Sequence, residues 1–158
     1  MAAEITYEQL NKLNAAYGSC IDDDRLEAWP EFFLDTCLYK ITTADNYRQG
    51  LAAGLVYADT KGMLRDRVTA LREANVYERQ WYRHLIGSPV IVECGQEGVR
   101  AETAFLVTRI MRGGKTDLFA TGKYIDRIVV DSEGRIRLAE RVVVCDSGTV
   151  DTLLAIPL

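Results

Sequence analysis

The sequence predicts an α+β domain in which N-terminal helices pack against the concave side of a curved antiparallel sheet. Three observations support this: helical periodicity near the N-terminus, β-rich runs joined by short turns in the second half, and the composition of one globular domain. The chain has 158 residues, 48% hydrophobic and 27% charged. A chain of this length buries about 68–70% of its unfolded surface, so we expect one domain over 1–158 with a core that needs no disulfide or structural metal.

The N-terminal quarter predicts a bent pair of helices. A capping-box pattern at residues 6–9, followed by apolar residues at helical spacing, predicts a helix over about 6–21. The three aspartates at 22–24 are expected to end this helix and to cap a short second helix over about 26–33. Adjacent carboxylates at such a junction lack the ligand spacing of a calcium loop, so capping is the preferred interpretation.

The next part of the chain predicts a strand and a third helix. Residues 36–43 are rich in β-formers and predict a strand, and a polar stretch follows. The apolar run 51–59 fits a strand or a buried loop, because its periodicity does not decide between them. A cap at Asp59 or Thr60 then begins an amphipathic helix. Its inward-facing residues are Leu64, Val68 and Leu71.

The second half predicts four strands joined by tight turns. The β-rich runs are 82–94, 99–111, 116–130 and 135–145. Their short connections require neighbouring strands to run antiparallel, because a parallel return needs a crossover of a dozen or more residues. In the last run, an apolar face of Ile136, Leu138, Val142 and Val144 alternates with Arg135, Arg137 and Arg141. We therefore expect these arginines to face solvent or a partner.

Composition and charge exclude several classes of function. With 19 basic and 23 acidic residues and no basic block, the chain lacks the charge pattern of a nucleic-acid-binding protein. No apolar run approaches the roughly 18–20 residues of a membrane span, and no signal peptide is recognisable, so we expect a cytoplasmic protein. The four cysteines, at positions 20, 37, 94 and 145, have no metal-site spacing and are expected to be reduced, mostly buried thiols.

The histidine count restricts the chemistry further. His84 is the only histidine, whereas a facial iron triad needs two histidines and a carboxylate, and a Rieske cluster needs two histidines and two cysteines. The sequence also lacks the signatures of dinucleotide binding, a P-loop, an acyl-transfer serine and a zinc protease. The chain alone cannot build either iron site.

Several segments resemble the small β subunits of aromatic ring-hydroxylating dioxygenases. They are 22–33, 51–67, 71–78, the Tyr82-Arg83-His84 triplet and 144–158, which together span nearly the whole chain. Within the family, the sequence is most similar to the terephthalate type, with the salicylate and anthranilate types as relatives.

The resemblance implies a cone-shaped fold of the nuclear-transport-factor-2 (NTF2) type and an assembly of three such chains with three large α subunits. In this family the α subunits hold the Rieske [2Fe–2S] cluster, the mononuclear Fe(II) and the substrate pocket. Electrons come from NADH through a reductase, and the product is a cis-dihydrodiol. The small subunit would then carry no cofactor and no catalytic residue, and would serve assembly.

Two groups of residues are candidates for the subunit contacts of a closed assembly, which needs two different patches on each chain. One group combines arginines with aromatic residues, as interface cores do. It consists of Arg65, Arg67, Arg72, Tyr77, Arg79, Trp81 and Arg83. The other is the apolar C-terminal segment with Leu153, Leu154, Ile156 and Leu158. A solvated helix face for the arginines, and the chain's own cone for the segment, remain alternatives.

A function of another class is also open at this point. Cone folds include isomerases and dehydratases that set a base against a tyrosine or a neutral acid in a dry cavity. Here Tyr17, His84 and Asp126 are the candidate residues, and His84 shares a strand face with Tyr82 by alternation. A third hypothesis is a ligand-binding or regulatory cone domain without a large-subunit partner.

Overall fold

The computed structural model describes residues 4–52, 54–74, 79–148, 154 and 156–158. Its elements are α1 (Tyr7–Asp22), a 3₁₀ turn η1 (Trp29–Phe32), β1 (Phe33–Thr43), α2 (Ala44–Arg48), β2 (Val56–Thr60), α3 (Lys61–Glu73), β3 (Gln80–Ile86), β4 (Val90–Gly95), β5 (Gly98–Met111), β6 (Thr116–Val130) and β7 (Ile136–Cys145). The predicted caps are confirmed, since Thr6 caps α1 reciprocally with Gln9 and Thr60 caps α3. The predicted inward-facing residues of α3, Leu64, Val68 and Leu71, are buried.

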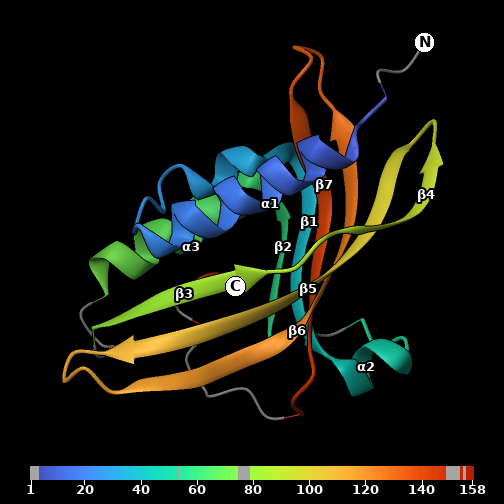
Figure 1. Cartoon of the computed structure of the whole chain (residues 1–158). Coiled ribbons are helices and arrows are strands. Elements are labelled where there is room, and N and C mark those ends of the chain that lie inside the picture. The colour runs from blue at the N-terminus through green and yellow to red at the C-terminus, as the bar shows by residue number, and fades with distance from the viewer. Residues whose placement is uncertain (1–3, 53, 75–78, 149–153, 155) are drawn as a thin grey trace.

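The strands form one seven-stranded curved sheet with the helices α1 and α3 on one face (Figure 1). The order is β2-β1-β7-β6-β5-β3, with β4 also paired to β5. The α+β prediction is confirmed, but the sheet is mixed, because β1 pairs with β7 in parallel. These two strands are joined by the whole intervening chain and not by a hairpin, so nothing in their connection requires them to run antiparallel.

Several local predictions need correction. The second helix is only the four-residue η1, whose N-cap is Ala28 without a side-chain hydrogen bond, so the aspartates at 22–24 end α1 but cap nothing after it. The undecided run 51–59 divides into a loop and β2. The predicted strand 82–94 breaks into β3 and β4 around Pro89, which has no N–H to donate to β5.

A β-bulge at Ala139 overturns the face predicted for Arg141. Arg127 pairs with Glu140 but the next residue of β6, Ile128, pairs with Leu138, so Ala139 is an extra residue in β7. An extra residue exchanges the two faces of the strand beyond it. Arg141 therefore points into the core and is completely buried, while Arg135 stays exposed as expected.

The buried guanidinium of Arg141 is held by an ion pair and by two aromatic rings. Its Nε and Nη2 donate to the two carboxylate oxygens of Asp126 at 2.9 and 2.7 Å, and Nη2 also donates to Asn14 at 2.6 Å. The guanidinium carbon lies 4.2 Å from the ring centre of Tyr17 and 4.0 Å from that of Tyr124. This cluster joins α1, β6 and β7 inside the curve of the sheet.

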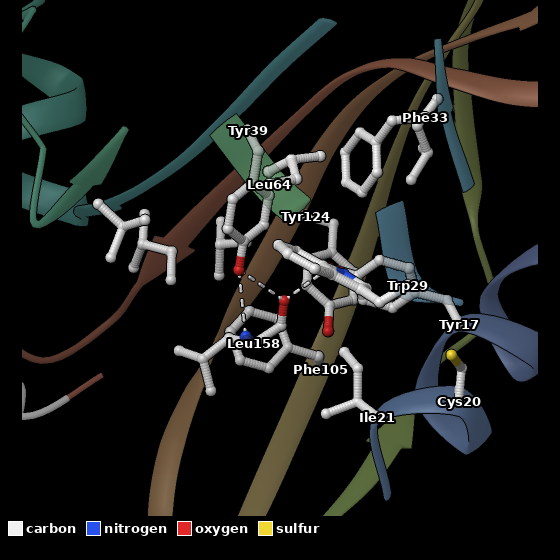
Figure 2. Packing of buried hydrophobic residues seen from close by; sticks show 14 of the residues in the cluster. Tyr17, Cys20, Ile21, Trp29, Phe33, Tyr39, Leu64, Phe105, Tyr124 and Leu158 are labelled. Atoms are coloured by element: carbon white, nitrogen blue, oxygen red, sulfur yellow. Dashed lines mark hydrogen bonds between the residues drawn. The ribbon is translucent and has the colours of Figure 1, made fainter. Parts of the chain in front are cut away.

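Aromatic side chains fill the rest of the interior (Figure 2). Trp29 and Phe33 each meet the ring of Tyr39 edge-on, at 5.0 and 5.8 Å between ring centres, and Tyr17 meets Tyr124 in the same way at 6.0 Å. Edge-to-face pairs at these separations are favourable beyond the area that they bury. In the described ranges, no helix is long and apolar enough to cross a membrane.

The prediction of mostly buried thiols is confirmed, since three of the four cysteines are buried. Cys20, Cys37 and Cys145 are buried, and burial raises the pKa of the Cys37 and Cys145 thiols to about 11. Cys94 is the exposed one. The reason is that every residue of β4 is exposed, because none of the described helices lies over this edge strand.

The buried ion pair makes stability depend on both of its partners. Replacing Asp126 with Asn leaves the Arg141 charge in the core without its counter-charge, and we expect a loss of about 3–5 kcal/mol in the free energy of unfolding. Urea denaturation measures this loss. The control is Asp117→Asn, whose partly exposed carboxylate lies 3.7 Å from Lys115 and should change stability by less than about 1 kcal/mol. Equal effects of the two variants would contradict the assignment.

The exposure of Cys94 predicts a simple thiol count. A native chain should react rapidly with Ellman's reagent at one thiol, and all 4 cysteines should react in urea. The Cys94→Ser variant should lose the rapid phase completely, because the remaining thiols are buried and have raised pKa values. A rapid phase that survives this substitution would refute the placement of β4.

Candidate functional site

The outer side of β3 carries an exposed apolar surface with arginines beside it. Tyr82 and His84 are buried, so Trp81, Arg83 and Leu85, which alternate with them, project from the opposite side of the strand. Across the sheet, Arg83 pairs with Thr108 and Thr108 with Leu118 of β6. We call Arg79, Trp81, Arg83, Leu85 and Leu118 the outer patch. Exposed large apolar side chains gathered in this way are typical of docking surfaces.

The leucines of the outer patch are among the most exposed large apolar side chains of the described residues, together with Val90 and Val92 of β4. Leu85 and Leu118 are 63% and 64% exposed, and Trp81 is 38% exposed with the Arg79 guanidinium 5.1 Å from its ring centre. The sequence predicted Arg79, Trp81 and Arg83 and missed the two leucines. Leu85 continues the alternation of Trp81 and Arg83 and could have been found. Leu118 could not, because its place beside them depends on strand register.

The three arginines predicted on α3 are bonded within the chain. Arg65 donates to Glu31 at 2.9 Å, and Arg72 donates to Asp24 and Glu27 at 2.7–3.1 Å. These carboxylates, Glu27 first and Asp24 second, raise the pKa of Arg72, and Arg72 in turn lowers the pKa of Glu27. Arg67 donates to the carbonyl oxygen of Leu154 at 3.1 Å. An interface role for these arginines stays a prediction.

The C-terminal segment packs on its own chain where it is described. Ile156 is 8% exposed and Leu158 is completely buried, and both belong to the core cluster. This is the alternative destination that the sequence left open. Leu154 is half-buried beside α3, held at its carbonyl by Arg67. Tyr77 and Leu153, also predicted at the interface, lie outside the described residues.

The residues of the alternative enzyme hypothesis are engaged with different partners. His84 pairs with Asp22 at the end of α1. The Asp22 carboxylate lies 2.6 Å from Nδ1 of His84 and accepts a hydrogen bond from the backbone N–H of His84 at 2.8 Å. Asp126 is bonded to Arg141, and the Tyr17 hydroxyl donates to Leu158 at 2.8 Å. The predicted shared face of Tyr82 and His84 is confirmed. The acidic partner of His84, however, comes from α1 and not from the neighbouring strands.

Hydroxyl groups lie around the C-terminal residue in the interior. Burial raises the pKa of Tyr17, and it raises the pKa values of Tyr39 and Tyr124 well above their ordinary range. All three phenols therefore stay protonated at neutral pH and can donate hydrogen bonds. Beside this interior, between α1, α3 and β3, lies an open groove of about 380 Å³ whose lining includes Ile21, Leu71, Trp81, Tyr82 and Ile156.

The described residues do not fit an iron centre. In these ranges, no three side chains among His, Cys, Asp and Glu are grouped so as to hold a metal ion. The single histidine of the sequence is buried with its Nδ1 bound to Asp22. Neither a facial triad nor a Rieske cluster can be built from one imidazole, so no chemical step is assigned to a metal in this chain.

Comparison with known proteins places this architecture in a family. The family described as ring hydroxylating beta subunit matches residues 18–152. The chain is 49% identical over 150 residues to the beta 1 subunit of the terminal oxygenase component of terephthalate 1,2-dioxygenase from Comamonas sp, covering 95% of this chain and 97% of that one. It is 36% identical over 153 residues to the anthranilate 1,2-dioxygenase small subunit from Burkholderia cepacia, covering 97% and 94%.

Solved structures agree in fold. The crystal structure assigned as the beta subunit of an aromatic-ring-hydroxylating dioxygenase from Novosphingobium aromaticivorans superposes with a TM-score of 0.88 at 43% identity, covering 96% of each chain. A structure from the same organism assigned as a scytalone dehydratase has a TM-score of 0.66 at 13% identity, covering 93% and 88%, and shares the cone fold alone. With a family match over most of its length and these close relatives, the chain belongs to the β subunits of aromatic ring-hydroxylating dioxygenases.

Proposed function

We propose that this chain is the non-catalytic small subunit of a Rieske non-heme iron oxygenase, in which three copies and three large subunits form one assembly. Membership of the β-subunit family supports the large-subunit partner. The proposal that the chain is non-catalytic rests on His84. This sole histidine is buried against Asp22 and cannot by itself complete a facial triad or a Rieske cluster. In this proposal the [2Fe–2S] cluster and the mononuclear Fe(II) lie in the large subunit. A separate reductase supplies electrons from NADH.

The proposed substrate of the complete enzyme is terephthalate. The 49% identity to a terephthalate 1,2-dioxygenase subunit over nearly the whole chain supports this choice over anthranilate, for which the similar subunit is 36% identical. A salicylate-type hydroxylase is the other alternative. Addition of O₂ with two electrons from NADH would convert the ring to a cis-dihydrodiol. We place this reaction in the cytoplasm, where NADH is available.

The outer patch is the proposed contact with the large subunit. It combines a tryptophan, two leucines and two arginines, a composition found at the centre of protein interfaces. Its leucines are more than 60% exposed in the isolated chain, so covering them would remove apolar area from water. The arginines of α3 are the weaker candidates, because carboxylates of their own chain bind Arg65 and Arg72 at 2.7–3.1 Å, whereas Arg83 lies 3.9 Å from the carboxylate of Asp22.

Assembly and activity test the proposed function. Produced together with its cognate large subunit, the chain should purify in a complex that converts terephthalate when iron, the reductase and NADH are present. The chain alone should show no visible absorption from an iron–sulfur cluster. The proposal fails if the isolated chain binds such a cluster, or if it turns over an enolisable ketone in a reaction that is lost in His84→Ala.

Charge placed in the outer patch should prevent assembly. Leu85→Glu and Leu118→Glu each bring a carboxylate into the proposed contact, and we expect at least a ten-fold loss of large subunit co-purified with the chain. The melting temperature of the isolated chain should change little, because both side chains are exposed. Leu55→Glu, at a leucine that is 52% exposed outside the patch, is the matched control. Normal assembly of both patch variants would place the contact elsewhere.

A further inference from the structure

The interior of the cone holds Leu158 by contacts of the kind that hold a ligand. Its carbonyl oxygen accepts hydrogen bonds from the hydroxyls of Tyr17 at 2.8 Å and Tyr39 at 3.1 Å, and its N–H donates to the Tyr39 hydroxyl at 3.1 Å (Figure 2). The side chain of Leu158 is completely buried. Two hydroxyls, from α1 and β1, thus converge on the backbone of one residue, and an apolar pocket takes its isobutyl group.

Nothing in the regular structure of the fold requires this segment. Leu158 belongs to none of the helices or strands, and the pairing of the seven strands is complete without it. Its backbone is bonded to the side chains of Tyr17 and Tyr39, which lie 141 and 119 positions away in the chain. Small-molecule sites have this construction, with a mostly apolar wall and a few convergent polar groups that fix orientation.

The walls of this pocket match one class of molecule. The ring of Tyr39 is packed against Trp29 and Phe33, and the ring of Tyr17 against Tyr124, so the surroundings are aromatic. The hydroxyl of Tyr124 is buried and has no hydrogen-bond partner within the described part of the chain. Neutral phenol donors beside an apolar space suit a branched or aromatic group that carries a carbonyl or carboxyl oxygen.

A route from solvent reaches the segment. Ile156 lies two residues before Leu158 and lines the open groove of about 380 Å³ between α1, α3 and β3. Outside the groove, Arg67 of α3 holds the carbonyl oxygen of Leu154 at 3.1 Å. None of the described contacts of Leu154, Ile156 and Leu158 belongs to the strand pairing, so the segment can leave without unpairing a strand.

We propose that the space around Leu158 is a binding pocket for small amphipathic amides or carboxylic acids, and that the chain's own C-terminal segment occupies it as a tethered ligand. The segment thereby closes the cavity that a cone-fold enzyme would leave for its substrate. This proposal concerns the isolated chain and does not depend on the contact with a large subunit.

A shortened chain that lacks residues 154–158 tests the proposal, with N-acetyl-L-leucinamide as the probe. This molecule has the N–H, the carbonyl oxygen and the isobutyl group of Leu158. We expect it to raise the melting temperature of the shortened chain with saturation at millimolar concentration, and to leave the full chain unchanged because the pocket is already filled. N-acetylglycinamide, which lacks the isobutyl group, should have no effect on either chain.

The hydroxyls can be tested one at a time. In the shortened chain, Tyr17→Phe should weaken binding of the probe about five-fold, as expected for one lost hydrogen bond. Tyr47→Phe, which removes an exposed hydroxyl, is the matched control. Absence of saturable probe binding to a folded shortened chain would overturn the proposal, and so would equal binding to the full chain.

A second variant covers the case in which the shortened chain does not fold. Leu158→Gly in the full chain keeps the backbone hydrogen bonds and removes only the isobutyl group. We expect benzene to raise the melting temperature of this variant and not that of the parent chain or of Leu55→Gly, because an apolar cavity lined by large side chains binds benzene. No response of Leu158→Gly to benzene would show that the space collapses, and would refute a preformed pocket.

Discussion

The burial of the Arg141 charge is the constraint on which the interior depends. A completely buried guanidinium needs a counter-charge, and the carboxylate of Asp126 on the neighbouring strand accepts two hydrogen bonds from it. The rings of Tyr17 and Tyr124 cover its faces, and Asn14 of α1 accepts a further hydrogen bond. The position of α1 on the sheet is therefore fixed by polar geometry as well as by apolar packing.

Many polar groups of the interior are engaged in contacts within the chain. Each candidate acid or base of the enzyme hypothesis is already bonded to a structural partner: Asp126 to Arg141, His84 to Asp22, and Tyr17 to the carbonyl of Leu158. The buried hydroxyls of Tyr17 and Tyr39, whose pKa values are raised by burial, donate to the main-chain oxygen of Leu158. These contacts hold α1 and the last residues of the chain against the sheet.

The two arginine-rich surfaces look alike in the sequence but differ in their surroundings. On α3, arginines face the carboxylates of η1 and of the turn after α1, and their charges are met within the chain. On β3, Arg79 and Arg83 flank exposed Trp81 and Leu85; Arg79 lies over the Trp81 ring, and Arg83 lies 3.9 Å from Asp22 at the end of α1, a longer contact than those of Arg65 and Arg72. Arginine-rich segments occur both at interfaces and on solvated helices. The two surfaces can therefore be told apart only by the neighbouring residues that the fold places beside the arginines.

Sequence alone determined the α+β class, the caps and inward faces of α1 and α3, and the turns of the second half, because these depend on neighbouring residues. The count of one histidine likewise excludes a facial triad or a Rieske cluster built by this chain alone, whatever the fold. Only the tertiary structure decided the parallel pairing of β1 with β7, the bulge at Ala139 that turns Arg141 inward, and the burial of Leu158 between Tyr17 and Tyr39. These features join residues about a hundred or more positions apart, or depend on the register between strands, and local periodicity contains no information on either.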